Sequence, residues 1–385
     1  MNSSDHSGSS TKPCAQANPD SGYGKSQRTE LQRVAAPELD YLPRMPRHFR
    51  PKIGLVGAGG ITEYHLRAYQ KMGLEVAGIC DRDLARAKAR RDTFYPEATV
   101  CTDYRDLLRR DEIEVIDAAL HPEPRVQLLE ACIDAGKHIL SQKPFALDLD
   151  LAMRLVESAH HRGIRMAVNQ NGRWAPHLAY ARKAVSAGLL GEIGSIDFQL
   201  AFDHNWTVGT AFEGIHHLVL YDFGIHWFDL AACFLGPRPL KTVFASVART
   251  GYQQARPPFL ASAIIDAEDA QVRMAFNASV VYGQSDRTCL TGSRGTLHAF
   301  GPTLSEQHVT LTTAEGECSP ALAGTWFENG FQGTMGELLG AIEENREPAN
   351  SARDNLRTLE LCFAALRSAD TGQSMRPGSV RRHNK

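Results

Sequence analysis

Two features of the sequence offer side chains that could transfer protons. Asp222, His226 and Asp229 lie within the apolar segment 221–235 at spacings of four and three, which places them on one face of a helix. Burying three ionisable groups in such a helix is costly unless they are partnered or used. The other candidate is Lys143, which follows closely on an apolar run. We interpret both as candidates for acid–base chemistry; a purely structural His–Asp pair and a surface lysine are the alternatives.

A glycine-rich turn is suited to holding the phosphates of a dinucleotide. It follows an apolar run and consists of Gly57, Ala58, Gly59, Gly60, Ile61 and Thr62. In a G-x-G-x-x-G-like turn, the first glycine permits the sharp bend, and the second lets the backbone approach a pyrophosphate at the next helix N-terminus. Thr62 takes the sixth position and is small enough for close packing of helix and strand. A glycine turn without a ligand is the alternative, and the surrounding strand–helix pattern disfavours it.

An acidic residue stands where ribose recognition is expected. Asp81 follows the next apolar run and lies 24 residues past Gly57. A carboxylate at this point can accept hydrogen bonds from the adenosine ribose hydroxyls, which favours NAD. Arg82 beside it is suited to a 2′-phosphate, so NADP stays open as an alternative.

The first half of the chain carries the pattern of a parallel sheet. Short apolar runs alternate with longer amphipathic segments, as in repeated βαβ units. We predict strands over 53–56, 76–80, 115–119, 138–140 and 165–168, with helices over 61–72, 84–93, 104–109, 125–135 and 148–161. These elements predict a Rossmann domain with a doubly wound parallel sheet over 51–170. They place Lys143 at the carboxyl edge of the sheet, where ligands bind in doubly wound folds.

After residue 170 the predicted strands and helices no longer alternate regularly. Helices are predicted over 176–187, 221–235, 336–344 and 352–369, and strands over 195–202, 242–247, 261–266, 271–277 and 296–299. Successive strands separated by turn residues indicate an antiparallel or mixed sheet with helices on one face. We predict an α+β domain over 171–377, preceded by a disordered tail and an extended arm over 1–50 that lies across the following domain. Residues 378–385 are predicted to form a tail.

Composition narrows the choice of partners. Lys and Arg number 42 against 44 Asp and Glu, mixed along most of the chain, so we expect neither nucleic acid nor an anionic membrane as partner. The eight cysteines show no paired spacing, which is typical of a protein of the reducing cytoplasm. The longest apolar stretch, 218–235, is interrupted by charged residues that a membrane span rarely tolerates. We therefore expect a small-molecule partner.

Several histidines raise the question of a metal site. His204, His216, His217 and His226, with Asp203, match no standard zinc spacing. Packed or solvated histidines are the simpler interpretation, so no metal is expected.

Taken together, these motifs resemble the glucose-fructose oxidoreductase/inositol dehydrogenase (Gfo/Idh/MocA) family. The matching elements cover about 51–377 and are the Gly57 turn, Asp81, the Pro122 loop, Gly136-Lys137-His138, Gln142-Lys143-Pro144, Asn171-x-Arg173-Trp174, Gly191-x-Ile193-Gly194 and Asp222-x-Gly224-x-His226-x-x-Asp229. The resemblance implies a Rossmann domain followed by a domain whose open, predominantly antiparallel sheet often serves oligomerisation. We accordingly expect a homo-oligomer that assembles through the C-terminal sheet.

The resemblance also assigns roles to residues. The catalytic lysine, aspartate and histidine of the family fall on Lys143, Asp222 and His226. Lys143 would stabilise charge on the reacting oxygen while His226 takes the hydroxyl proton, and Asp222 would orient substrate or His226. Asp229, one turn beyond His226, would support the site without contacting the substrate. The cofactor-binding residues are predicted to be Gly57, Gly59, Gly60, Ile61, Asp81, Arg82, His121, Pro122, Gln142 and Lys143.

Departures from the family pattern concern the cofactor loop and the substrate. Gln142 replaces the usual glutamate before Lys-Pro, His121-Pro122-Glu123 replaces Thr-Pro-Asn, and His216-His217-Leu218 replaces a glycine-rich segment. We predict that the substrate contacts include Arg173, Trp174, His217 and Tyr221, with His204 and Trp206 as further candidates, because aromatic faces and polar groups suit sugar rings.

The sequence therefore predicts an NAD(P)-dependent oxidoreductase of a sugar, sugar acid or cyclitol. Two alternatives remain open. One is a redox-assisted glycosidase of the same family, in which NAD is regenerated at each turnover. The other is a non-catalytic dinucleotide-binding regulator.

Overall fold

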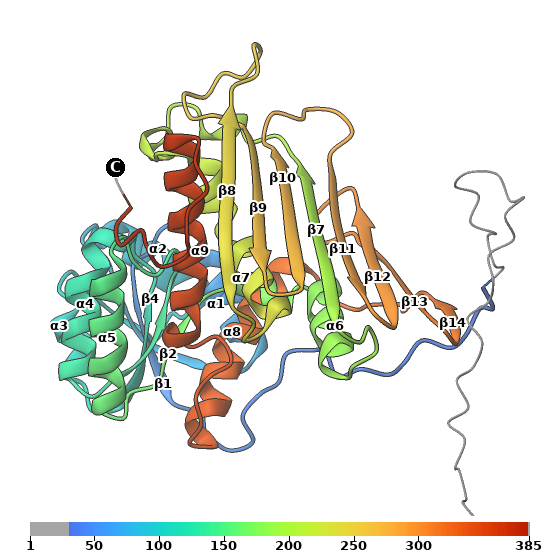
Figure 1. The fold of residues 1–385 in the computed structure, drawn as a ribbon. Helices are drawn as coiled ribbons and strands as arrows, with labels where there is room; N and C mark the ends of the chain where they lie inside the picture. Colours follow the sequence, from blue (N-terminus) through green and yellow to red (C-terminus); the bar gives the residue numbers. More distant parts are fainter. Residues whose placement is uncertain (1–30, 384–385) are drawn as a thin grey trace, which may run out of the picture.

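A computed structural model of the chain describes residues 31–383, and the predicted tail up to residue 30 lies outside them. Two sheets dominate the structure (Figure 1). The N-terminal sheet is entirely parallel, with the strand order β3-β2-β1-β4-β5-β6 that is typical of a Rossmann fold. Its strands are β1 (Lys52–Val56), β2 (Glu75–Cys80), β3 (Thr99–Cys101), β4 (Ile113–Ala118), β5 (His138–Ser141) and β6 (Met166–Val168). The predicted fold class of this domain is confirmed.

The helices of the Rossmann domain follow the strands in alternation. They are α1 (Thr62–Lys71), α2 (Leu84–Phe94), α3 (Arg105–Leu108), α4 (Pro122–Asp134) and α5 (Leu149–His161). Strand β3 was not predicted because its three residues are too short to show a period.

The second sheet has eight strands in the order β14-β13-β12-β11-β7-β10-β9-β8. They are β7 (Ile193–Ala201), β8 (Leu240–Ala248), β9 (Leu260–Ala267), β10 (Ala270–Asn277), β11 (Ser285–Gly292), β12 (Gly295–Gly301), β13 (His308–Thr313) and β14 (Gly316–Cys318). Neighbours are antiparallel except β7 and β10, which run parallel. The predominantly antiparallel sheet is as predicted.

One face of this sheet is buried and the other is open. In β8, Val243 and Ala245 are buried while Phe244 between them is exposed. Helices α7 (Ile225–Leu235) and α9 (Ala352–Thr371) pack on the strands, and α6 (Pro176–Ser186) precedes β7. Among residues 31–383, every helix is too short or too polar to cross a lipid bilayer.

Helix α8 (Trp326–Glu343) begins ten residues before the predicted start at Gly336. The prediction was wrong because glycine has low helix propensity, and three glycines occur in this stretch. The same glycines permit close packing. A Cβ atom at Gly330 would collide with Asn171, one at Gly333 with the Trp174 ring, and one at Gly336 with the carbonyl of Arg44. The tertiary contacts of these glycines therefore outweigh their low helix propensity in α8.

The chain ends tie the two domains together. Residues 31–50 run from the edge strand β14 to α8 (Figure 1). Beside β14, Val34 N donates to Glu317 O over 3.0 Å. At α8, the Glu343 carboxylate accepts from the backbone N–H groups of Arg47 and His48, each over 2.6 Å. These hydrogen bonds join the predicted arm to the second domain, and Met45 and Phe49 of the arm pack against a hydrophobic cluster that includes residues of β1. At the other end, Arg381 O accepts from Leu149 N over 2.8 Å, so the C-terminal tail lies against the start of α5.

Candidate active site

The glycine turn has room for a dinucleotide pyrophosphate. Gly57 follows β1 with φ +102°, and a Cβ atom there would lie 2.6 Å from the carbonyl oxygen of Ala119, so only glycine fits. A Cβ added at Gly59 or Gly60 would meet nothing within 4 Å. This open space borders the first turn of α1, whose N–H groups favour an anion. Thr62 Oγ1 closes the turn by donating to Gly59 O over 2.6 Å.

Asp81 lies directly beside the turn. Its Oδ2 accepts from the backbone N–H of Ala58 over 2.7 Å, and its Oδ1 accepts from Asp83 N over 2.9 Å. The carboxylate is therefore held at the end of β2, in reach of a ribose next to the pyrophosphate. Arg82 is exposed beside it. Sequence reasoning missed Arg90 of α2, whose Nη2 donates to Gly59 O over 3.1 Å.

The remaining cofactor candidates follow the next strands. His121 and Pro122 start α4 after β4, and Gln142 and Lys143 follow β5. All stand at the carboxyl edge of the parallel sheet, on the same edge as the glycine turn.

Lys143 and Asp222 meet across the domain boundary. Lys143 Nζ lies 2.8 Å from the backbone carbonyl oxygen of Asp222 and 3.2 Å from its Oδ2. Both side chains are mostly buried. Asp222 belongs to a π-helical turn, η4 (Val219–Phe223), just before α7. Such turns are frequent at functional sites, and this one turns the Asp222 carbonyl and carboxylate towards the lysine.

His226 stands one turn beyond Asp222 in the first turn of α7. Burial, together with the positive charge of Lys143, holds the pKa of His226 well below its usual value. Its Nδ1 is buried with no hydrogen-bond partner among the described residues. A neutral imidazole can accept a proton, and the nearby ammonium group can donate a hydrogen bond to the oxygen that loses it.

A buried network that the sequence analysis missed supports Gln142. Its Oε1 accepts from the backbone N–H of Lys143 over 2.8 Å, and its Nε2 lies 3.2 Å from His65 Nε2. His65 Nδ1 is 2.7 Å from Asp117 Oδ2, which also accepts from the Tyr69 hydroxyl over 2.6 Å. An aspartate inside the apolar run 115–119 was the available signal.

Arg173 and Trp174 were predicted as substrate contacts, and the structure instead places both in domain packing. Arg173 Nε and Nη2 donate to the two carboxylate oxygens of Asp229, each over 2.6 Å, and Nη2 also reaches Asp354 over 2.6 Å. The Trp174 ring packs against Gly333 of α8. Asp229, predicted as a supporting residue, accepts from Arg173 through both of its carboxylate oxygens.

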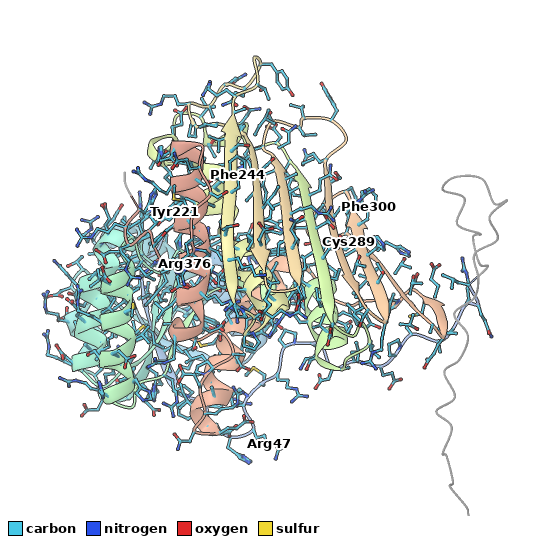
Figure 2. The ribbon with its side chains drawn as sticks, in the orientation of Figure 1. Arg47, Tyr221, Phe244, Cys289, Phe300 and Arg376 are labelled. Atoms are coloured by element: carbon cyan, nitrogen blue, oxygen red, sulfur yellow. The ribbon has the colours of Figure 1, made fainter. Side chains whose placement is uncertain are left out.

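His217 and Tyr221 flank the start of η4. His217 Nε2 lies 2.9 Å from Asp370 Oδ1. Tyr221 is next to Asp222, its hydroxyl has no partner among the described residues, and burial raises the pKa of that hydroxyl. Its ring centroid lies 4.3 Å from that of His383 in the C-terminal tail. Figure 2 shows Tyr221 beside α9.

An aromatic cluster borders Asp222 on its other side. The His204 ring lies 4.3 Å from Phe223, and Trp206 Nε1 donates to His204 Nδ1 over 3.1 Å. The Trp206 ring lies 5.2 Å from Phe212 and remains 55% exposed. Phe212 and Phe223 were not among the predicted contacts. Phe212 lies in a segment without a periodic signal, and Phe223 lies in the predicted helix 221–235, where an aromatic residue is expected to pack in the core.

Comparison with known families matches both domains. Residues 51–170 match a model described as an oxidoreductase family with an NAD-binding Rossmann fold, and residues 178–298 match the GFO/IDH/MocA C-terminal domain. The chain is 27% identical over 356 residues to a D-apiose dehydrogenase of Paraburkholderia graminis, which covers 85% of this chain and 89% of that enzyme. It is 28% identical over 337 residues to an inositol 2-dehydrogenase of Rhizobium meliloti, covering 82% and 96%.

Solved structures share the fold. An oxidoreductase from Agrobacterium radiobacter, in complex with NAD+, L-tartaric acid and magnesium, superposes with a TM-score of 0.77 at 22% identity, covering 86% of this chain and 99% of that one. A levoglucosan dehydrogenase in complex with NADH and levoglucosan gives a TM-score of 0.73 at 19% identity, covering 86% and 100%.

Proposed function

The chain belongs to the Gfo/Idh/MocA family of oxidoreductases, with an NAD-binding Rossmann domain, and we propose that it transfers hydride between nicotinamide and a secondary alcohol or ketone of a sugar, sugar acid or cyclitol. One observation carries the proposal. Lys143 and Asp222, from different domains, are in contact at the sheet edge that holds the glycine turn, with His226 one helical turn away.

Each of these side chains has a role in alcohol oxidation. Bound NAD+ would supply the hydride acceptor. His226, kept neutral by its lowered pKa, takes the hydroxyl proton, and Lys143 donates a hydrogen bond to the same oxygen and stabilises its developing negative charge. Asp222 holds the ammonium of Lys143 in place through Oδ2 and the backbone carbonyl. In the reverse direction His226 returns the proton to the new hydroxyl.

We propose NAD as the preferred cofactor. The Asp81 carboxylate, fixed beside the turn by Ala58 N, suits ribose hydroxyls and would repel a 2′-phosphate. Arg82 and Arg90 keep some use of NADP open.

A ring-shaped substrate fits the surroundings of Asp222. Trp206 offers an exposed indole face next to Phe212 and Phe223, and aromatic faces pack against the C–H faces of sugar rings. Relatives named for D-apiose and inositol support the same substrate class.

The test is a screen of NAD and NADP reduction across sugars, sugar acids, inositols and glycosides with the full chain. Accumulation of NADH with one group of polyols is expected. Glycoside cleavage without net NADH would identify the redox-assisted glycosidase instead. Binding of NAD without turnover of any member of the panel would favour a regulator.

We also propose a homo-oligomer that assembles through the open face of the second sheet. Phe244, Ile264 and Phe300 are each at least 40% exposed there, and Figure 2 shows Phe244, Cys289 and Phe300 spread from β8 to β12. Light scattering of the wild type and of Phe244→Asp tests this, because a charge on a buried interface should dissociate the assembly. A wild-type monomer would contradict it.

A further inference from the structure

Two adjacent histidines and a distant aspartate converge at the start of the catalytic turn. We propose that His216, His217 and Asp370 bind a divalent transition-metal ion, with Zn²⁺ the best-fitting ion. The site is separate from Lys143 and His226, and it does not depend on which substrate the enzyme uses.

The ligand atoms already lie close together. His216 Nε2 is 2.7 Å and His217 Nε2 is 2.9 Å from the same oxygen, Oδ1 of Asp370. One ligand atom from each residue lies within 4.8 Å of the others. Zn–N and Zn–O bonds of about 2.0 Å set ligand atoms roughly 3.3 Å apart in a tetrahedral site. The two histidine–aspartate distances would thus have to open by only about half an ångström to admit the ion.

The set of donors suits zinc chemically. Two imidazoles and one carboxylate are ligands that Zn²⁺ accepts, and a solvent molecule can take the fourth position. His217 is 8% exposed, whereas the His216 side chain is 38% exposed and that of Asp370 is 26% exposed. One ligand is therefore firmly held while the other two leave a path for the ion and for water.

The backbone at His217 is also unusual. Its φ of 46° lies in the left-handed region, which residues other than glycine seldom adopt. This conformation turns both neighbouring imidazoles to the same carboxylate, with ring centroids only 3.8 Å apart. A strained backbone of this kind is retained where the surroundings fix it, frequently at ligand sites.

A metal here would connect two elements of the active-site region. His217 O accepts from Leu220 N and Tyr221 N, each over 2.9 Å, and so begins η4, which carries Asp222. Asp370 lies at the end of α9. An ion bound between them would fasten the start of η4 to α9. We expect it to stabilise the fold, because a ligand that binds only the folded state raises the unfolding temperature.

The sequence spacing could not reveal this site. The expectation that no metal binds was based on local histidine spacing, whereas Asp370 lies 153 residues beyond His217. The carboxylate is brought in by α9, an element of the tertiary structure.

The test is Zn²⁺ binding to the full-length chain without a polyhistidine tag, after removal of metals with a chelator. Calorimetric titration of wild type should give one ion per chain, and Co²⁺ should give a visible absorption band. His216→Ala and Asp370→Ala should each weaken Zn²⁺ at least tenfold and abolish the rise in unfolding temperature. Both residues are partly exposed, so these variants should fold.

The control is His161→Ala. His160 and His161 form another adjacent pair, at the exposed end of α5, and the variant should bind Zn²⁺ as wild type does. Absence of saturable binding, or equal affinity in wild type, His216→Ala and Asp370→Ala, would overturn the proposal. Zinc binding and sugar oxidation are measured separately, so failure of either leaves the other intact.

Discussion

Lys143 of the Rossmann domain and Asp222 of the second domain are joined by two contacts, from Nζ to the backbone carbonyl oxygen over 2.8 Å and to Oδ2 over 3.2 Å. The carbonyl that accepts from Lys143 belongs to η4, a π-helical turn of a kind that is frequent at functional sites. The contact between the two domains at this point is therefore made by the two residues proposed to act in catalysis.

Replacement of Lys143 by alanine should reduce kcat by roughly a hundredfold or more, because the reacting oxygen loses its charge-stabilising donor. NAD binding should change little, since the glycine turn and Asp81 are untouched. Steady-state kinetics and NADH fluorescence titration measure the two effects. Unchanged turnover would contradict the assignment of Lys143.

The pH dependence should report His226. Its pKa is lowered first by burial and then by Lys143, so the imidazole is neutral near pH 7 and protonates only in acid. We expect kcat/KM for alcohol oxidation to be level near neutrality and to fall as the pH drops through that lowered pKa, below the usual histidine value of about 6.5. In Lys143→Met the acid limb of the residual activity should shift to higher pH, because the repelling charge is gone. An acid limb unmoved by this substitution would contradict the assignment.

Asp81 should determine the choice of cofactor. In Asp81→Ala the ribose hydroxyls lose an acceptor and a 2′-phosphate loses a repelling charge, while Arg82 and Arg90 remain. We expect kcat/KM with NAD to fall about tenfold, as for a lost charged hydrogen bond, and the NADP-to-NAD ratio to rise. Asp83→Ala, two residues away, is the matched control. Equal losses with both cofactors would indicate a purely structural Asp81.

Trp206 should affect substrate affinity more than chemistry. Removal of the exposed indole in Trp206→Ala should raise KM for ring-shaped polyols by about threefold to tenfold, as expected for loss of an aromatic contact, with little change in kcat. Trp206→Phe retains a ring and should recover most of the affinity. A wild-type KM in the alanine variant would exclude Trp206 from the substrate site.

The sequence predicted which polar residues lie at the carboxyl edge of the parallel sheet better than it predicted the partners of buried charges. The glycine turn, Asp81 and Lys143 follow from strand endings, which a local pattern reveals. Asp229 shares a helical face with His226, yet it pairs with Arg173, 56 residues earlier in the chain. Strand β3 and the start of α8 were missed because their formation depends on neighbouring strands and on glycine contacts. The spacing of residues along a helix shows which side chains share a face of that helix. It does not show which side chains from distant parts of the chain pack against that face.

Arg173 offers a direct test of that correction. The Arg173 and Asp229 side chains are 2% and 1% exposed, so Arg173→Met would leave an uncompensated buried carboxylate. We expect a loss of about 3–5 kcal/mol in the free energy of unfolding, measured in denaturant. Arg353→Met, which breaks an exposed pair with Glu157, should leave the free energy of unfolding close to that of wild type. If Arg173→Met were as stable as wild type but raised KM, Arg173 would belong to the substrate site after all. The structure predicts the opposite, because Asp229 and Asp354 already occupy its guanidinium group.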